Sequence, residues 1–399
     1  MQPVRLSLTF RILTPMFIGG AEGKAGPPEL RAPSIKGMLR FWYRALDPMW
    51  QKSINPKHEK LKKITREVAW FGGCASNAGQ SPFLIMLNNV PSVNPVSFPN
   101  RVGQGLAYIG YPFKGWRDAP SRQAIPSNQT FTLDICVIRC LDSPEFRRAL
   151  TASLWCMGNL GALGSRNRRG FGALALESWK VKTGDWPEFE QLALLSMHET
   201  AKAWLTAFDK NLETIGDWFN WKEQTSESTK PSHRPQPHFG QKYKRRLQGK
   251  AFKLEDWQGI LDYMGGWLQQ YRSRRSPDYE NVKNYIDRRV PLKHAPQRAA
   301  FGLPITFRYR SLPGSRPVTF LPFDRQTNET HERHGSLLFL RPVLINGQLY
   351  PLYIRMDGDV PGFSPIAAPR GRQGLPPPEV NAMDDFLNWL KENRGERRG

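Results

Sequence analysis

Residues 4–12 alternate strictly between apolar and polar side chains, and residues 131–137 repeat the alternation over a shorter run. A period of two is typical of a strand that is buried on one face only. Two further apolar runs, at 82–87 and 172–178, indicate two more strands. The first half of the chain therefore holds four predicted strands.

Two helices are predicted between these strands by apolar residues recurring every three to four positions. The first spans residues 34–46, with Ser34 as its expected N-cap, and the second begins at Pro144 and ends near Leu160. A third, at 57–71, is expected to end at Gly72-Gly73. Residues 88–128 are rich in Pro, Gly, Asn and aromatic residues, which indicates an insertion or a hairpin.

The order strand, helix, strand, strand, helix, strand predicts a ferredoxin-like (RRM-like) domain over residues 1–182. Residues 183–399 are expected to form a second, degenerate ferredoxin-like domain, with a basic insertion around 222–255. The predicted fold class is α+β: two ferredoxin-like domains with insertions and antiparallel sheets. The elements expected in the second half are helices at 187–209, 256–271, 278–289 and 384–390, and strands at 305–309, 337–340 and 349–356.

The net charge of the chain indicates which class of partner it binds. Lys and Arg number 57 against 35 Asp and Glu, a formal charge of +22, which indicates a polyanion such as nucleic acid. An anionic membrane is the second candidate, but no apolar segment approaches the roughly 18 residues of a spanning helix, so no membrane partner is expected. The chain starts with an alternating segment instead of a signal peptide, so we expect it in the cytoplasm. The four cysteines include no Cys-x-x-Cys pair, and no metal or other cofactor is expected.

Residues 160–172 join the second helix to the last strand with four glycines, three arginines and no acid. Glycines allow positive φ, so that N–H groups converge on an anion, and arginines add forked donors. The helix-to-strand order is the reverse of a dinucleotide-binding turn, and no Gly-Lys-Ser/Thr sequence marks a P-loop. The segment, named here the Gly/Arg loop, is thus a candidate phosphate site, or alternatively an ordinary solvated turn.

Three cations follow one another at intervals of four along the first predicted helix: Lys36, Arg40 and Arg44. Residues four apart share a helix face, so these side chains form one row without an intervening carboxylate. Gly37 leaves space beside this cation row. The row is either a solvated basic face or a surface that follows a phosphate backbone.

Residues 14–20, 28–46 and 163–172 closely resemble motifs of the RAMP superfamily, as found in the type III-B CRISPR effector (Cmr) complex, and 301–305 adds a weaker likeness. The resemblance implies a subunit that binds the 3′ region of guide RNA, target RNA or both, together with other Cmr-complex protein subunits. Gly335-Ser336-Leu337 departs from the family pattern in the second half. The implied RNA-binding residues are Lys36, Arg40, Arg44, Gly164, Ser165, Arg166, Asn167, Arg168, Arg169, Gly170 and Phe171.

Three functions fit these features. The first is a non-catalytic RNA-binding subunit. The second is a metal-independent endoribonuclease that processes guide RNA precursor, since other RAMP members use His, Tyr or Lys as general acid or base; His58 and Tyr43 are the nearest candidates. The third is a structural subunit whose basic face binds proteins. Aromatic residues in 105–116 suit either base stacking or a partner contact.

Overall fold

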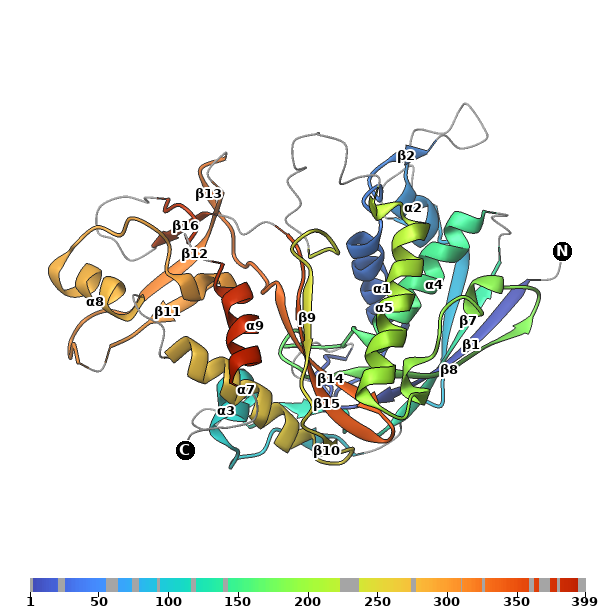
Figure 1. Ribbon diagram of the computed structural model, residues 1–399, viewed down its shortest axis with the longest axis horizontal. Helices are drawn as coiled ribbons and strands as arrows, with labels where there is room; N and C mark the ends of the chain where they lie inside the picture. The colour runs from blue at the N-terminus through green and yellow to red at the C-terminus, as the bar shows by residue number, and fades with distance from the viewer. Residues whose placement is uncertain are drawn as a thin grey trace. The chain divides into compact units, whose positions relative to one another are not determined.

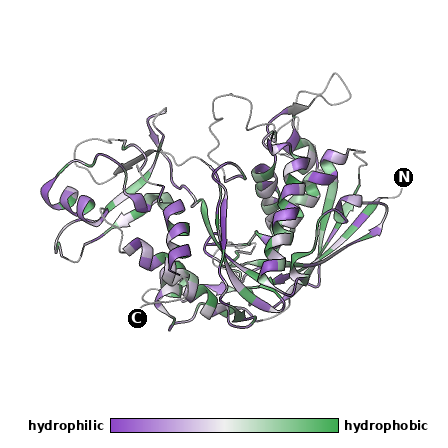
Figure 2. Cartoon of the chain, in the orientation of Figure 1, coloured by the Kyte–Doolittle hydropathy of each residue, from purple (hydrophilic) through white to green (hydrophobic). Residues whose placement is uncertain are grey.

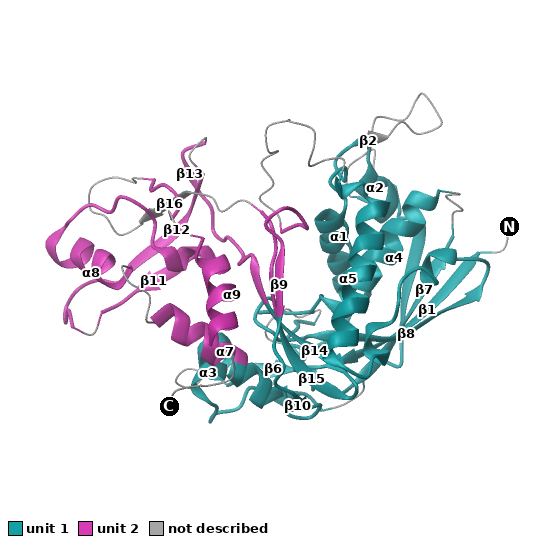
Figure 3. Ribbon diagram, in the orientation of Figure 1, with its two compact units in different colours: residues 1–230, 247–263, 340–352 teal, residues 231–246, 264–339, 353–399 magenta. Residues whose placement is uncertain are grey.

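The computed structural model describes residues 3–20, 26–54, 64–73, 79–91, 94–115, 120–138, 143–222, 237–273, 278–309, 311–324, 327–358, 362–365, 374–378 and 381–393. The chain divides into two compact units (Figure 3). Unit 1 contains residues 1–230, 247–263 and 340–352, and unit 2 contains 231–246, 264–339 and 353–399. The predicted boundary at residue 182 stays a prediction.

Unit 1 is built on a four-stranded antiparallel sheet in the order β4-β7-β1-β8. The strands are β1 (Val4–Ile12), β4 (Phe83–Asn88), β7 (Thr130–Val137) and β8 (Leu174–Thr183). The predicted alternation of β1 is confirmed, because Leu6, Leu8 and Phe10 are fully buried while Arg5 is exposed. The order of these strands is that of a ferredoxin-like sheet.

Two helices cover one face of this sheet (Figure 1). They are α1 (Ala32–Leu46) and α4 (Pro144–Asn159), which pack on each other, and α5 (Ala201–Trp218) packs on α4. The predicted N-cap of α1 was wrong: the cap is Arg31, and the N–H of Ser34 donates to its carbonyl at 3.0 Å. Pro33 explains the earlier start, because proline suits the first helical turn. Apolar residues lie along the strands and on the helices that cover them (Figure 2).

The connections differ from expectation in three places. The predicted 57–71 helix is reduced to α2 (Arg66–Phe71) after the short strands β2 (Ser53–Ile54) and β3 (Ile64–Thr65), and residues 57–63 lie outside the described residues. The predicted insertion holds α3 (Gln104–Gly110), the 3-10 helix η1 (Tyr111–Phe113) and the strands β5 (Val96–Ser97) and β6 (Gln123–Ala124). The predicted 187–209 helix is two 3-10 turns, η2 (Pro187–Phe189) and η3 (Leu195–Met197), followed by α5.

The remaining elements are also helices and antiparallel strands, so the α+β class is confirmed. In unit 2, β12 pairs with three neighbours, and Val282, Phe307 and Phe320 lie in one apolar core. The elements that follow α5 along the chain, in either unit, are β9 (Lys244–Leu247), β10 (Phe252–Lys253), α7 (Trp257–Ser273), α8 (Asp278–Arg288), η4 (Gln297–Phe301), β11 (Ile305–Phe307), β12 (Val318–Asp324), β13 (Glu329–Thr330), β14 (Leu338–Ile345), β15 (Gln348–Arg355), β16 (Gly362–Pro365) and α9 (Ala382–Glu392).

Candidate nucleic-acid interface

The backbone of the Gly/Arg loop turns through positive φ at Gly164, Arg166, Gly170 and Gly172. Two of these glycines are also required by close packing. A Cβ atom on Gly172 would lie 2.0 Å from the Leu163 carbonyl oxygen, and one on Gly164 would lie 2.7 Å from the Phe17 carbonyl oxygen. These two glycines therefore allow the two ends of the loop to pack on each other, and they allow the loop to pack on the segment after β1.

Several loop amides are already satisfied by the protein, which corrects the expectation of an open nest of N–H groups. The N–H groups of Leu163, Ser165, Arg169 and Gly172 donate to the carbonyls of Gly172, Phe17, Arg166 and Pro15 at 2.9, 2.8, 2.8 and 3.0 Å. Amides used in this way are not available to an anion. Recognition of an anion by this loop must therefore depend mainly on its side chains.

Each of three arginines around the loop rests on an aromatic ring. The guanidinium carbon of Arg166 lies 4.5 Å from the centre of the Tyr111 ring, and that of Arg168 lies 5.6 Å from the centre of Phe41. Arg122, which the sequence analysis did not identify, lies over Phe113 at 5.8 Å and donates to the Ser165 hydroxyl at 2.8 Å. Such contacts fix the direction of a long cationic side chain.

The three loop arginines are half-buried. Burial lowers the pKa of Arg168 to about 10, which is still well above 7. Burial also lowers the pKa of Arg122. Positive charge in partly dehydrated surroundings acts more strongly on an incoming anion than the same charge in bulk water.

Two of the predicted RNA-binding residues are packing residues instead. Phe171 is fully buried, and its ring meets those of Phe17 and Phe113 edge-on, with centroids 5.6 and 5.0 Å away. A buried ring cannot touch RNA, so the predicted contact by the Phe171 side chain was wrong. Gly170 is also buried, and a Cβ there would lie 2.6 Å from the Leu261 side chain. Asn167 donates to the Ala162 carbonyl at 3.4 Å, within the loop.

Arg341, which lies far along the chain, binds the residues that flank the Gly/Arg loop. Arg341 is 1% exposed, and it donates from Nη2 to the Leu174 carbonyl at 2.5 Å and from Nε to the Asn159 carbonyl at 3.5 Å. The preceding residue donates its N–H to the Arg168 carbonyl at 3.1 Å. Burial lowers the pKa of Arg341 to about 9. The sequence analysis missed this residue, although an arginine inside the apolar run 337–345 was a detectable signal.

The cation row of α1 is held by a carboxylate that the sequence analysis did not assign to it. Glu67 on α2 accepts from Arg40 Nε at 2.7 Å and from Arg44 Nε and Nη2 at 2.9 and 2.5 Å. The side chain of Glu67 is 4% exposed, whereas those of Arg40 and Arg44 are 29% and 31% exposed. The carboxylate thus comes from another helix, although none intervenes within the row itself.

The row nevertheless keeps excess positive charge, because two arginines share one carboxylate. Within the described residues, Nε is the only group of Arg40 with a hydrogen bond, so its two terminal nitrogens remain for another acceptor. Lys36 donates to the Ser81 hydroxyl at 2.6 Å, and burial, followed by the charge of Arg40, lowers its pKa. A Cβ on the exposed Gly37 would meet nothing within 4 Å, so the space beside the row is open.

The Gly/Arg loop and α1 are neighbours. Arg168 lies over Phe41, which belongs to α1 and directly follows Arg40. Residues on a helix are separated by about 100°, so Phe41 lies on the flank of the row rather than in it. The loop thus touches the side of α1 next to the cations. The contact of Arg168 with Phe41 thus connects the loop to the helix that carries the cation row.

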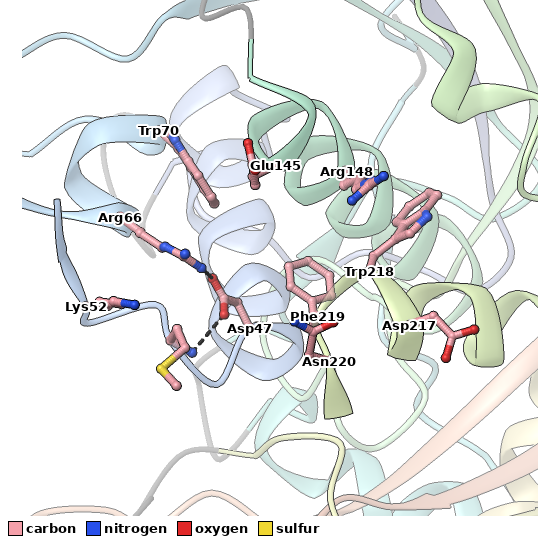
Figure 4. A pocket seen from close by; sticks show the side chains of 11 residues that line it. Asp47, Lys52, Arg66, Trp70, Glu145, Arg148, Asp217, Trp218, Phe219 and Asn220 are labelled. Atoms are coloured by element: carbon pink, nitrogen blue, oxygen red, sulfur yellow. Dashed lines mark hydrogen bonds and ion pairs between the residues drawn. The ribbon is translucent and has the colours of Figure 1, made fainter. Parts of the chain in front are cut away.

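A separate cavity of about 430 Å³ lies at the carboxyl end of α1 (Figure 4). Three cations and three carboxylates line it, so its charge is balanced and does not favour phosphate: Lys52, Arg66, Arg148, Asp47, Glu145 and Asp217. Arg66 and Asp47 are 3.6 Å apart.

Tyr43 contacts the wall of this cavity from inside the protein. Its hydroxyl donates to Asp47 Oδ2 at 2.6 Å, and burial followed by the Asp47 charge raises its pKa. A buried tyrosine that resists ionisation is unsuited to act as a general base. The other catalytic candidate, His58, lies outside the described residues.

The described residues contain no group of three or more His, Cys, Asp or Glu side chains placed to hold a metal ion. None of the helices they form combines the length and apolar character needed to cross a membrane.

Known proteins resemble this chain in both sequence and fold. Residues 9–175 match the model of the RAMP superfamily. The matched segment runs from within β1 to the start of β8, and it contains α1 and the whole Gly/Arg loop.

The full chain extends the likeness. It is 27% identical to the CRISPR system Cmr subunit Cmr1-1 of Pyrococcus furiosus over 289 residues, which are 69% of this chain and 70% of the relative. Its fold matches the crystal structure of Cmr1 from Pyrococcus furiosus in the apo form, with a TM-score of 0.53, 17% identity and 96% of each chain covered. It also matches a chain of the type III-B Cmr-beta complex bound to cognate target RNA, with a TM-score of 0.52 and 13% identity over 97% and 99% of the two chains. At these identities, the structural matches show a shared fold.

Proposed function

We propose that the chain is a non-catalytic RNA-binding subunit of a cytoplasmic type III-B CRISPR-Cas (Cmr) ribonucleoprotein in antiviral defence. It binds the 3′ region of guide RNA, target RNA or both by the phosphate backbone. The observation that carries this proposal is the Gly/Arg loop, where Arg166 and Arg168 are held on aromatic rings beside α1. The likeness to Cmr1-1 and to a chain of an RNA-bound Cmr complex supports the same function.

Phosphate recognition follows from the side chains that the fold brings together. The forked guanidinium groups of Arg166, Arg168 and Arg169 offer paired donors to phosphate oxygens. Arg40 supplies further donors on the neighbouring helix. None of these groups needs a particular base, so the site reads the backbone and not the sequence. Other Cmr subunits would complete the RNA path.

Fluorescence anisotropy of a labelled single-stranded RNA, titrated with the full chain at several salt concentrations, tests this proposal. Each phosphate contact on a single strand contributes about −0.7 to the slope of log K against log[salt]. Changing Arg166, Arg168 and Arg169 together to Gln should therefore flatten the slope by about 2 and weaken binding to unrelated sequences equally. A loss restricted to one sequence contradicts backbone recognition.

The matched control removes the same charge elsewhere in unit 1. Lys180, Lys202 and Lys210 are exposed lysines on β8 and α5. Changing all three to Gln should leave the slope nearly unchanged. A slope that flattens equally in both triple variants would assign binding to overall charge and overturn the site.

The endoribonuclease alternative is tested on a gel with end-labelled RNA, with and without EDTA. The proposal expects intact RNA in both lanes. Cleavage by the purified chain that His58→Ala abolishes would replace the binding function with catalysis.

A further inference from the structure

Tyr111 is an aromatic side chain that the fold places in solvent beside the Gly/Arg loop. It opens η1 directly after α3, and the residue is 67% exposed. A single exposed ring is common on protein surfaces and does not by itself mark a site, so the neighbours of Tyr111 must decide its role. The same ring lies under the Arg166 guanidinium, 4.5 Å from its carbon.

The neighbours of Tyr111 hold its backbone rigidly. Phe113, two positions later, is buried and stacks on Phe17 with centroids 3.8 Å apart and planes at 12°. Gly110, directly before, lies so close to Phe98 that a Cβ would approach that ring to 2.6 Å. A ring presented from a fixed backbone loses little entropy when it binds.

The position combines the two features that proteins use for single-stranded nucleic acid. An aromatic face stacks on a base of any identity, and an adjacent cation binds the backbone. In this structure, Arg166 and Tyr111 supply both within one contact. The sequence alone left the aromatic residues of 105–116 undecided between base stacking and a protein partner. Of these rings, Phe113 is buried and Tyr111 is exposed.

We propose that Tyr111 stacks on one nucleobase of the single-stranded RNA whose phosphate is bound at Arg166. The inference rests on the proposed function and adds a base-stacking position to it. The contact is tolerant of sequence because every base offers a π face. It adds affinity through stacking, and so it should not add to the salt dependence.

The experiment uses the full chain, Tyr111→Leu, Tyr111→Phe and a set of RNAs that carry 2-aminopurine at successive positions. Wild type should quench the fluorescence of one position on binding, and Tyr111→Phe should preserve this quench. Tyr111→Leu should lose the quench and bind about 5- to 160-fold more weakly, with an unchanged salt slope. Thermal melting checks that each variant is folded.

The outcomes separate the two proposals. If wild type binds RNA with the expected salt slope and Tyr111→Leu binds equally well, the stacking inference is wrong. If Tyr111→Leu flattens the slope, the side chain acts through Arg166 and does not stack. If wild type itself does not bind RNA, the proposed function fails, and the stacking inference fails with it.

Discussion

Because Arg40 and Arg44 share the Glu67 carboxylate, removing its charge should change how the cation row binds RNA. Glu67→Gln keeps the shape of the side chain and removes its charge. Arg40 and Arg44 then lose the only carboxylate they contact within the described residues, and the local excess charge rises by one. If the row faces RNA, one more cation becomes available to phosphate.

The size of the effect can be worked from these contacts. One added phosphate contact on single-stranded RNA steepens the salt slope by about 0.7. Between 200 and 50 mM salt, the affinity gain should therefore grow by about 2.6-fold. The stability cost comes from three charge-assisted hydrogen bonds that become weaker. Because both arginines are about 30% exposed, water offsets part of the lost interaction. We therefore expect the free energy of unfolding to fall by about 1–3 kcal/mol.

Anisotropy titrations at four salt concentrations measure the slope, and urea unfolding measures the stability. Glu177→Gln is the matched control, since Glu177 pairs with Arg11 on the sheet and its loss changes the net charge equally. The control should leave the slope close to that of wild type. A folded Glu67→Gln variant with an unchanged slope, or a control that steepens it equally, would refute the placement of the row in the RNA site.

Three other predictions concern stability and loop geometry. Gly172→Ala should destabilise the protein by more than about 3 kcal/mol because of its clash, whereas Gly347→Ala, with φ +70 and no neighbour within 4 Å, should cost about 1–2 kcal/mol; equal urea midpoints would contradict this. Tyr43 has a raised folded pKa, so its stabilisation is complete below pH 10 and is lost above it, by up to about 1.4 kcal/mol per pH unit; Tyr43→Phe should remove this dependence in urea unfolding at pH 9 and 11. Arg341→Gln should open the Gly/Arg loop about ten- to a hundredfold more often, measured as faster trypsin cleavage there, and unchanged cleavage would deny the anchor.

Local patterns were enough to predict the four-stranded sheet of unit 1 and the helices α1 and α4, because each of these elements depends on residues close in sequence. The alternation in residues 4–12 predicted β1, and the glycine and arginine content of residues 160–172 predicted the loop. Phe171 was misassigned, because a phenylalanine between two glycines resembles a loop residue until the core that receives its ring is known.

Long-range contacts were beyond the sequence analysis. Glu67 lies 23 and 27 positions from the arginines it binds, and no local pattern connects them. Arg341 directly follows the predicted strand at 337–340, and nothing in the sequence reveals which carbonyls its side chain will meet. The free amides expected in the loop were wrong for a related reason, because their acceptors include the carbonyls of Pro15 and Phe17.

The contacts of Arg341 have a consequence for the order of synthesis. Arg341 follows Leu174 by 167 positions and Asn159 by 182, so it emerges from the ribosome long after the Gly/Arg loop has emerged. A nascent chain that ends at residue 182 contains every loop arginine and lacks the side chain that ties the loop ends together. Full RNA affinity should consequently appear late in translation, once the segment after residue 340 has emerged and docked.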